Sequence, residues 1–352
     1  MSIADGMAAI NLEMPDRIPR TEYSAQNHWA LIAAETGIEV NLNSSDEVKM
    51  RAQQAFMKAW SYDFNWSILI SSDEFGEKRS HMGHAVYADG GTDYDQRQGL
   101  LFDDPEAALA FDPMTLYGKR EESELIHAFN RHYDANCDYF ADAVNMTGVY
   151  ITCMSGFIEA LGWETLLMAA GIDSKGFGEC ATRYCRWMLS YFEALAKSKT
   201  PVVMIHDDIV WTEGAFLHPD WYRTYLFPNY KKMFQPLLDS GKKIIFTSDG
   251  NYTEFVSDLV SCGVHGFVLE PCTDLKAIAD AYGQSHVIIG NADTRILLYG
   301  DKPAIRAEVE RCMNIGRRCP GFFMAVGNHI PANTPVENAQ YYNQVYQELS
   351  KR

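Results

Sequence analysis

The chain has 352 residues, of which 47% are hydrophobic and 22% charged, as in an ordinary globular protein with enough chain for a large core. Its net charge of −17 argues against binding to nucleic acid or to anionic membranes, because phosphate recognition needs clustered cations. The first 20 residues lack the basic start of a signal peptide, and no apolar stretch approaches the ~20 residues of a membrane helix. We therefore expect a cytoplasmic protein.

Eight predicted strands can be followed along the chain. Three short segments of the first half are expected strands, namely Arg17–Tyr23, Phe64–Ile70 and Val149–Met154. Five clearer β-branched runs follow, each succeeded by an amphipathic helical stretch; they are Pro201–Ile205, Lys243–Phe246, Gly266–Leu269, His286–Ile289 and Phe322–Ala325. Such alternation indicates parallel strands covered by helices. Because eight strands close a barrel, we predict a single (β/α)₈ (TIM) barrel domain over residues 1–352, with an open doubly wound sheet as the alternative.

A long insertion, residues 71–147, separates the expected second and third strands. Within it, the segment from His84 to Tyr94 carries a Gly-Gly pair flanked by aromatic residues, which predicts a β-hairpin. An insertion at this place is expected to form a lid over the barrel mouth, and a purely structural flap is the alternative.

Polar side chains gather directly after the five clearer strands. The set comprises His206, Asp207, Asp208, Asp249, Glu270, Cys272, Asn291, Asp293, Asn328 and His329. In a parallel barrel these positions surround one cavity, where they suggest a divalent metal site or acid–base catalysis. Each also has a structural alternative: Asp249 or Asp293 could cap a helix, Asp208 a turn, His329 could bond a loop, and Cys272 could be a packed thiol.

Several short motifs mark the chain from its start to its last helix. They are Asp16–Pro19, His206–Asp208 with Pro219 and Pro228, Ser248–Asn251, Gly290–Asp293 with Leu297–Gly300, and Gly327–Pro331 with Thr334, Pro335, Glu337 and Asn338. In this order and spacing the chain resembles the uroporphyrinogen decarboxylase family, and within it the corrinoid-dependent methyltransferase branch. The similarity covers most of the chain, is strongest from about Pro201 to Tyr342, and implies a (β/α)₈ barrel.

The decarboxylase activity itself is not expected from this resemblance. Decarboxylases of the family bind a substrate with eight carboxylates and use an arginine-rich N-terminal segment to do so. The corresponding stretch here, Arg20–Trp29, contains one arginine. A carboxylate-lined mouth on an acidic protein is also a poor host for a polyanion.

The methyltransferase branch holds zinc through a His-x-Cys pair after the fifth strand and a cysteine after the eighth. Here Thr247 and Asp249 stand at the pair, and Asn328 or His329 stands at the late cysteine. Loss of the thiolates argues against an enzyme that methylates thiols. The remaining expected zinc ligands are harder and suit the polarisation of an oxygen; they are Asp249, Glu270 and His329, with Cys272 as a further candidate.

The resemblance thus implies O-demethylation of a small methyl donor, most simply an aryl methyl ether such as a methoxylated phenol. The methyl group would pass to cobalt of a cobalamin carried by a separate corrinoid protein. His206, Asp207 and Asp208 are the expected catalytic residues, the first two as candidate proton donors. The expected substrate contacts are Tyr23, His28, Trp66, Trp211, Asn291 and Asp293, with barrel packing as the alternative for each aromatic ring.

Two other functions fit the same residues. One is a metal-free lyase of the decarboxylase type, in which the carboxylates perform acid–base chemistry. The other is a non-catalytic barrel that binds a cobalamin-loaded partner. The donor's identity and the oligomeric state stay open, and a homodimer is compatible with the sequence.

Overall fold

The core of the computed structural model, which describes residues 1–80, 85–88, 91–94, 101–102 and 104–352, is a parallel sheet. Six strands pair in the order β12-β11-β10-β9-β6-β5. Their bounds are β5 (Thr147–Val149), β6 (Val202–His206), β9 (Lys243–Thr247), β10 (Gly266–Leu269), β11 (Val287–Gly290) and β12 (Phe322–Phe323). All five strands predicted from the second half of the sequence are therefore confirmed.

Shorter pairings close this sheet on itself. Strands β1 (Phe64–Asn65) and β4 (Val144–Asn145) pair in parallel. Arg20 forms parallel bridges to Tyr62 on one side and to Met324, directly after β12, on the other. These contacts add a first and a second strand position beside the third, so the predicted (β/α)₈ barrel is confirmed.

The first three strands are shorter than the sequence predicted, and the third was misplaced. In the first expected strand, Arg20 alone pairs with neighbouring barrel strands, while Arg17 forms an antiparallel bridge to Lys351 near the end of the chain. The second is paired at β1 and again at an isolated bridge from Ile70 to Val149. The third runs over β4 and β5, whereas the predicted segment Val149–Met154 leaves the sheet and enters a helix at Met154. Asn145 and Gly148 interrupt the apolar pattern of the true strand, which displaced the prediction towards the apolar residues after it.

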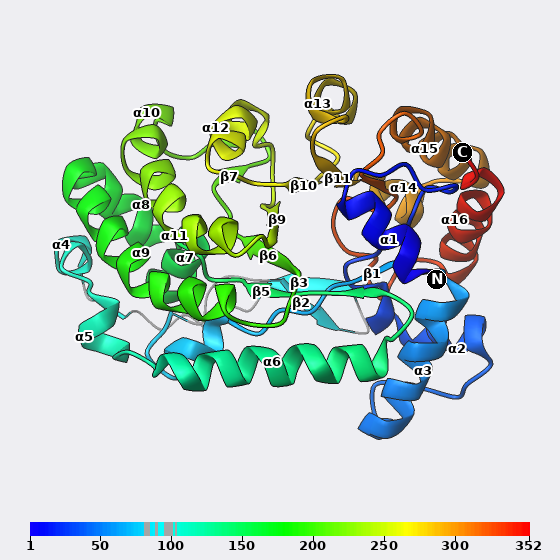
Figure 1. Ribbon diagram of the computed structural model, residues 1–352, viewed down its shortest axis with the longest axis horizontal. Helices are drawn as coiled ribbons and strands as arrows, with labels where there is room; N and C mark the ends of the chain where they lie inside the picture. Colours follow the sequence, from blue (N-terminus) through cyan, green and yellow to red (C-terminus); the bar gives the residue numbers. More distant parts are fainter. Residues whose placement is uncertain (81–84, 89–90, 95–100, 103) are drawn as a thin grey trace.

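Helices cover the outside of the barrel, as Figure 1 shows. In the first half they are α1 (Ile3–Ile10), η1 (Ala25–Asn27), α2 (Trp29–Thr36), α3 (Asp46–Ala59), η2 (Ser72–Phe75), α4 (Pro105–Leu109), α5 (Pro113–Tyr117), α6 (Glu122–Tyr139), α7 (Met154–Leu161), α8 (Trp163–Ile172) and α9 (Ser174–Ala196). In the second half they are α10 (Pro219–Trp221), the π-helical turn η3 (Tyr222–Leu226), α11 (Phe227–Asp239), η4 (Thr253–Phe255), α12 (Val256–Ser261), α13 (Leu275–Tyr282), α14 (Thr294–Tyr299), α15 (Lys302–Gly316) and α16 (Val336–Leu349).

Side chains alternate between the two faces of the closed sheet. Met204 of β6, Ile245 of β9 and Ile289 of β11 belong to the cluster inside the barrel, whereas their neighbours in sequence pack against the helices. Helix α1 supplies Ala9 and Ile10 to the same interior cluster and so closes the base of the barrel. The opposite end, where the strands finish, is left for a site.

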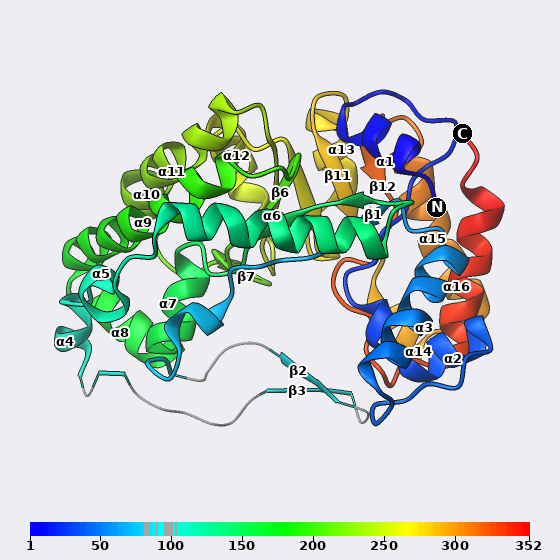
Figure 2. The same cartoon turned by 60° about the horizontal axis from the view of Figure 1, so that its bottom comes forward.

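The insertion expected at residues 71–147 contains η2, α4, α5, α6 and the predicted hairpin. The hairpin is confirmed as antiparallel pairing of β2 (Ala85–Ala88) with β3 (Gly91–Tyr94), although its Gly-Gly turn starts at Gly90, outside the described residues. In Figure 2 this hairpin lies apart from the other elements, at the bottom of the view. Barrel pairing resumes at Val144, before the expected end of the insertion. The lid role stays a prediction.

Among the described residues, no helix combines the length and apolarity that crossing a bilayer requires. A further short pairing, β7 (Val210–Trp211) with β8 (Gly214–Ala215), forms a hairpin after β6. All eight cysteines are free thiols and six of them are buried, where a thiol packs as a small hydrophobic group.

Candidate functional site

A pocket at the carboxyl ends of the strands receives one side chain from each of the eight strand positions. It encloses about 440 Å³ of space, part of which is open to solvent. In strand order these eight residues are Tyr23, Trp66, Tyr150, His206, Thr247, Val268, Ile289 and Ala325. The ring is segregated, with aromatic rings from the first three strands, polar groups from the fourth and fifth, and aliphatic groups from the last three.

His206 is the last residue of β6 and is held on three sides. Its ring stacks on Tyr150 at a centroid distance of 3.7 Å and an angle of 3°. Its Nδ1 lies 3.2 Å from the Tyr150 carbonyl oxygen, and its Nε2 lies 3.3 Å from Oδ1 of Asp208. Burial by itself lowers the pKa of His206, but the carboxylates of Asp208 and Asp249 raise it to about 9.

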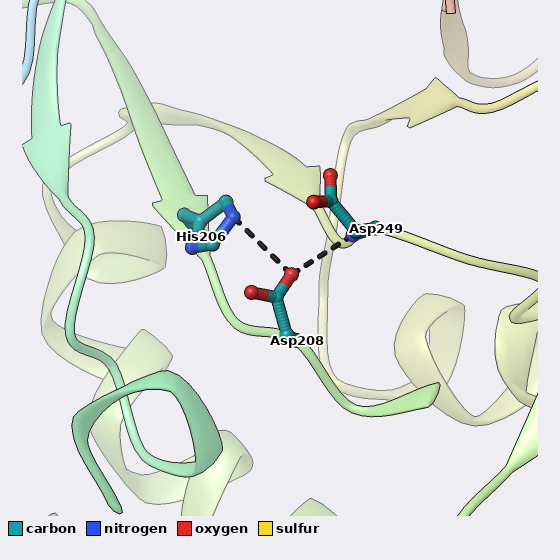
Figure 3. A group of neighbouring side chains, drawn as sticks. All are labelled: His206, Asp208 and Asp249. Carbon is teal, nitrogen blue, oxygen red and sulfur yellow. Dashed lines mark hydrogen bonds and ion pairs between the residues drawn. The ribbon is translucent and has the colours of Figure 1, made fainter. Parts of the chain in front are cut away.

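Asp208 and Asp249 meet across the loops after β6 and β9 (Figure 3). The Asp249 backbone N–H donates to Oδ1 of Asp208 over 2.9 Å. Gly250 makes this turn available, because its φ is +86° and a Cβ there would come within 2.6 Å of the Trp211 carbonyl oxygen. The loops are thereby locked with both carboxylates beside His206.

The charge on Asp249 is strongly disfavoured in this setting. Its side chain is exposed towards the pocket, yet protein surrounds the carboxylate, and burial is the largest cause of its raised pKa. The like charges of Asp208 and Glu270 add to this against the opposing charge of His206, and the pKa of Asp249 reaches about 8. A cation placed between these groups would relieve the repulsion.

The donor chemistry of His206, Asp208 and Asp249 fits a divalent metal ion. One ligand atom from each lies within 4.8 Å of the others. Zinc bonds of about 2.0–2.2 Å require ligand atoms somewhat closer than this, which small side-chain rotations can provide. When Nδ1 of His206 carries the proton, it donates to the Tyr150 carbonyl and Nε2 presents its lone pair, as metal-bound histidines commonly do.

The four ligands predicted from the sequence do not form one group among the described residues; Asp249 alone belongs to the group above. Both oxygens of Glu270 already accept hydrogen bonds, from the Gly250 backbone N–H at 2.8 Å and from Asn328 Nδ2. The Cys272 thiol lies 3.8 Å from Glu270, and burial raises its pKa to about 11, which disfavours the thiolate. His329 lines the pocket, but its Nδ1 contacts Ser24 Oγ.

The carboxylate of Asp207, predicted as catalytic, is hydrogen-bonded within the protein core. Its Oδ1 accepts the backbone N–H groups of Cys153 (3.1 Å) and Ser155 (2.7 Å) at the start of α7. Its Oδ2 accepts the hydroxyl of Tyr230. The side chain is fully buried and does not line the pocket, so its contacts indicate a structural role, and the proton-donor role stays a prediction.

The six predicted substrate contacts divide into two that line the pocket, Tyr23 and Trp66, and four that do not. Asp293 caps α14 by accepting the Arg295 backbone N–H, the structural alternative for this residue. Asn291 is buried and bonded to the Glu270 and Thr273 carbonyls. His28 caps α2, and Trp211 packs on Trp163 and Phe216 beside the β7–β8 hairpin.

Tyr150 is the main site residue that the sequence did not predict. Misplacement of the third strand put it inside the expected strand, although it directly follows β5 and occupies the same inward position as His206 on β6. Val268 and Ile289 were also missed, because aliphatic residues within strands resemble core. Counting inward positions by two from each strand would have found all three.

The chain is similar to known proteins both in sequence and in fold. The uroporphyrinogen decarboxylase (URO-D) family model matches residues 144–349. The uroporphyrinogen decarboxylase of Carboxydothermus hydrogenoformans is 26% identical over 212 residues, which span 59% of this chain and 58% of that protein. The Thermus thermophilus uroporphyrinogen decarboxylase is 29% identical over 46% of each chain. The chain thus matches only about half of the length of these curated relatives.

A solved methyltransferase from Methanosarcina mazei shares the fold across both chains. It superposes with a TM-score of 0.67 and covers 99% of each chain at 15% sequence identity. At this identity the likeness establishes the architecture alone. With the family model matched from β4 to the end of α16, the chain belongs to the uroporphyrinogen decarboxylase family.

Proposed function

We propose that this protein is a methyltransferase that moves a methyl group from a small donor, an aryl methyl ether, to the cobalt of a corrinoid protein. The observation that carries the proposal is the segregated pocket. An aromatic wall of Tyr23, Trp66 and Tyr150 stands beside a polar group of His206, Asp208 and Asp249. A flat aromatic ring can stack on the first while its ether oxygen meets the second.

A zinc ion is proposed at His206, Asp208 and Asp249, in place of the ligand set expected from the sequence. Such an ion would supply Lewis-acid polarisation of the ether oxygen. The chain's own part is to orient the ligand atoms: Tyr150 fixes the His206 ring by stacking, and the Asp249 backbone N–H fixes the Asp208 carboxylate. This ligand set contains no thiolate, which suits an oxygen rather than a sulfur substrate.

The transfer itself breaks the methyl–oxygen bond and forms a methyl–cobalt bond, with both electrons of the new bond coming from cobalt(I) of the partner. The oxygen keeps the electrons of the broken bond and leaves as a phenolate. The pocket opens at the barrel mouth, where a corrinoid held by another protein could approach. The shared architecture with the Methanosarcina mazei methyltransferase is compatible with this use of the barrel.

A metal-free lyase is the second candidate, and one observation favours it. With a pKa of about 9, His206 holds a proton at neutral pH and forms an ion pair with Asp208, as a general acid would. The surroundings of Arg20, the single arginine of the N-terminal segment Arg20–Trp29, argue against a porphyrinogen substrate. It is fully buried, is paired with Glu22 and lies against Trp60, so it cannot bind a substrate carboxylate.

Parallel turnover assays separate the two candidates. Purified protein is incubated with a methoxyphenol and reduced cobalamin, and separately with uroporphyrinogen, each with and without a chelator. The proposal predicts methylcobalamin formation that the chelator abolishes and zinc restores. Decarboxylation of uroporphyrinogen without any corrinoid, unaffected by the chelator, would establish the lyase instead.

A further inference from the structure

The Thr247 hydroxyl is a buried polar group at the floor of the pocket with no hydrogen-bond partner among the described residues. Thr247 ends β9, pairs with His206 in register and is 6% exposed. Its Oγ1 forms no hydrogen bond with any part of the chain that the structure describes. Burying a hydroxyl without a partner is unfavourable, so each such group in a native fold calls for an explanation.

The direction of this side chain supplies the explanation. Along β9, Ile245 points into the barrel and Ile244 and Phe246 point towards the helices, so Thr247 points inward at the top of the barrel. There it lines the pocket between His206 and Val268. Thr147 on β5 also has a buried hydroxyl without a partner, but it does not line the pocket. Thr247 is therefore placed to meet a ligand, and Thr147 is not.

The surroundings restrict what that ligand group can be. The polar sector of the eight-residue ring consists of His206 and Thr247. Asp249, Asn328 and His329 from the loops after the strands also line the pocket, and the described lining contains no lysine or arginine. The aromatic ring of a ligand that lies between the aromatic wall and the aliphatic wall of Val268, Ile289 and Ala325 presents one edge to this polar sector. A hydroxyl on that edge can both donate to and accept from Thr247 Oγ1.

We propose that Thr247 determines donor specificity by hydrogen-bonding a free hydroxyl on the ring of the methyl donor. The inference rests on the proposed function and narrows its substrate class to methoxyphenols, as opposed to methoxybenzene and other ethers without a free hydroxyl. The ether oxygen faces His206 and Asp249, and the second oxygen faces Thr247. Thr247 positions the substrate and takes no part in bond breaking.

Binding measurements test this without any requirement for turnover. Affinities of methoxybenzene and of the three methoxyphenol isomers are measured by titration calorimetry, with and without added zinc. We expect at least one isomer to bind wild-type protein about tenfold more tightly than methoxybenzene, the size of one net hydrogen bond. Thr247→Val, which keeps the side-chain shape, should remove this preference, and Thr247→Ser should keep it.

Thr147→Val is the matched control, because it deletes an equally buried hydroxyl outside the pocket. It should keep the full preference for the methoxyphenol. An unchanged preference in a folded Thr247→Val protein, or equal affinities of all four compounds for wild type, would overturn the inference. If the preference behaves as expected but no methylcobalamin forms, the inference on binding stands and the proposed function fails.

Discussion

The carboxylates at the two ends of the barrel have different surroundings. At the base, Asp63 is fully buried and both its oxygens accept donors: Arg17 and the Ser2 backbone N–H on one, and the Arg20 backbone N–H at 3.0 Å on the other. At the mouth, Asp208 and Asp249 lie beside the imidazole of His206. The like charges of Asp208 and Glu270 help to raise the pKa of Asp249 to about 8. The ion pair of Asp63 with Arg17 at the base stabilises the fold. The mouth has more carboxylates than cationic side chains, an arrangement suited to a cation.

The largest expected effect comes from removing a carboxylate at the mouth. Asp249→Ala should abolish zinc binding and lower kcat/KM for methyl transfer by roughly a thousandfold, because Lewis-acid polarisation contributes several kcal/mol. Thermal stability should not fall, since the substitution relieves like-charge repulsion. Metal analysis, steady-state kinetics and a melting curve check this, with Glu213→Gln, on the exposed β7–β8 hairpin, as a surface control.

At the base the same kind of substitution should act on stability alone. Asp63→Ala leaves Arg17 without its buried partner and should lower the free energy of unfolding by about 3 kcal/mol. Zinc stoichiometry and kcat/KM per folded molecule should equal those of wild type. Denaturant unfolding combined with metal analysis makes the comparison, and loss of zinc from the folded variant would show that the two ends are not independent.

Asp207→Asn tests whether Asp207 acts in catalysis, as its position after β6 suggested, or in stability, as its hydrogen bonds indicate. The amide can still accept hydrogen bonds from the start of α7 but cannot replace every contact of the carboxylate, so we expect a loss of about 2 kcal/mol in stability. Kinetics measured well below the melting temperature should show a kcat within about twofold of wild type. A kcat collapse in stable protein would return Asp207 to the catalytic group.

The smallest effect is expected from a histidine on the strand-entry side. Burial, with Lys243 and His286 nearby, lowers the pKa of His265 to about 4, below the ~6.5 of an unfolded chain. The folded state therefore resists protonation, and stability should fall as the pH drops from about 6.5 towards 4. Because the side chain is partly exposed, we expect about 1–2 kcal/mol from this residue.

His265→Asn isolates that contribution. The wild-type and variant proteins are unfolded by urea between pH 7 and pH 4.5, and the difference between their unfolding free energies is followed with pH. The stability of the variant should decline less steeply. Parallel curves would mean that His265 does not titrate as its surroundings indicate.

Much of the barrel could be predicted from sequence periodicity, because strands β6, β9, β10 and β11 are continuous apolar runs followed by helices. The first three strands could not, since Arg20 and β1 pair over only one or two residues and β4 and β5 are interrupted by polar residues and glycine. Their inward residues Tyr23, Trp66 and Tyr150 form a whole wall of the site.

The candidate ligands show where sequence reasoning stops. Their positions directly after strands correctly predicted that four residues lie at one end of the barrel, namely His206, Asp208, Asp249 and Glu270. It could not tell that the Asp207 side chain turns into the core, or that Glu270 is occupied by Gly250 and Asn328. Those outcomes depend on loop contacts between residues far apart in the chain, which no local pattern encodes.

If the function proposed above is right, the excess of carboxylates at the mouth holds a metal ion beside the aromatic wall. Anomalous diffraction at the zinc edge, from crystals grown with one equivalent of zinc, tests it directly. We expect a single strong peak within bonding distance of His206 Nε2 and carboxylate oxygens of Asp208 and Asp249. A peak at Glu270 and Cys272, or none in the pocket, would contradict it.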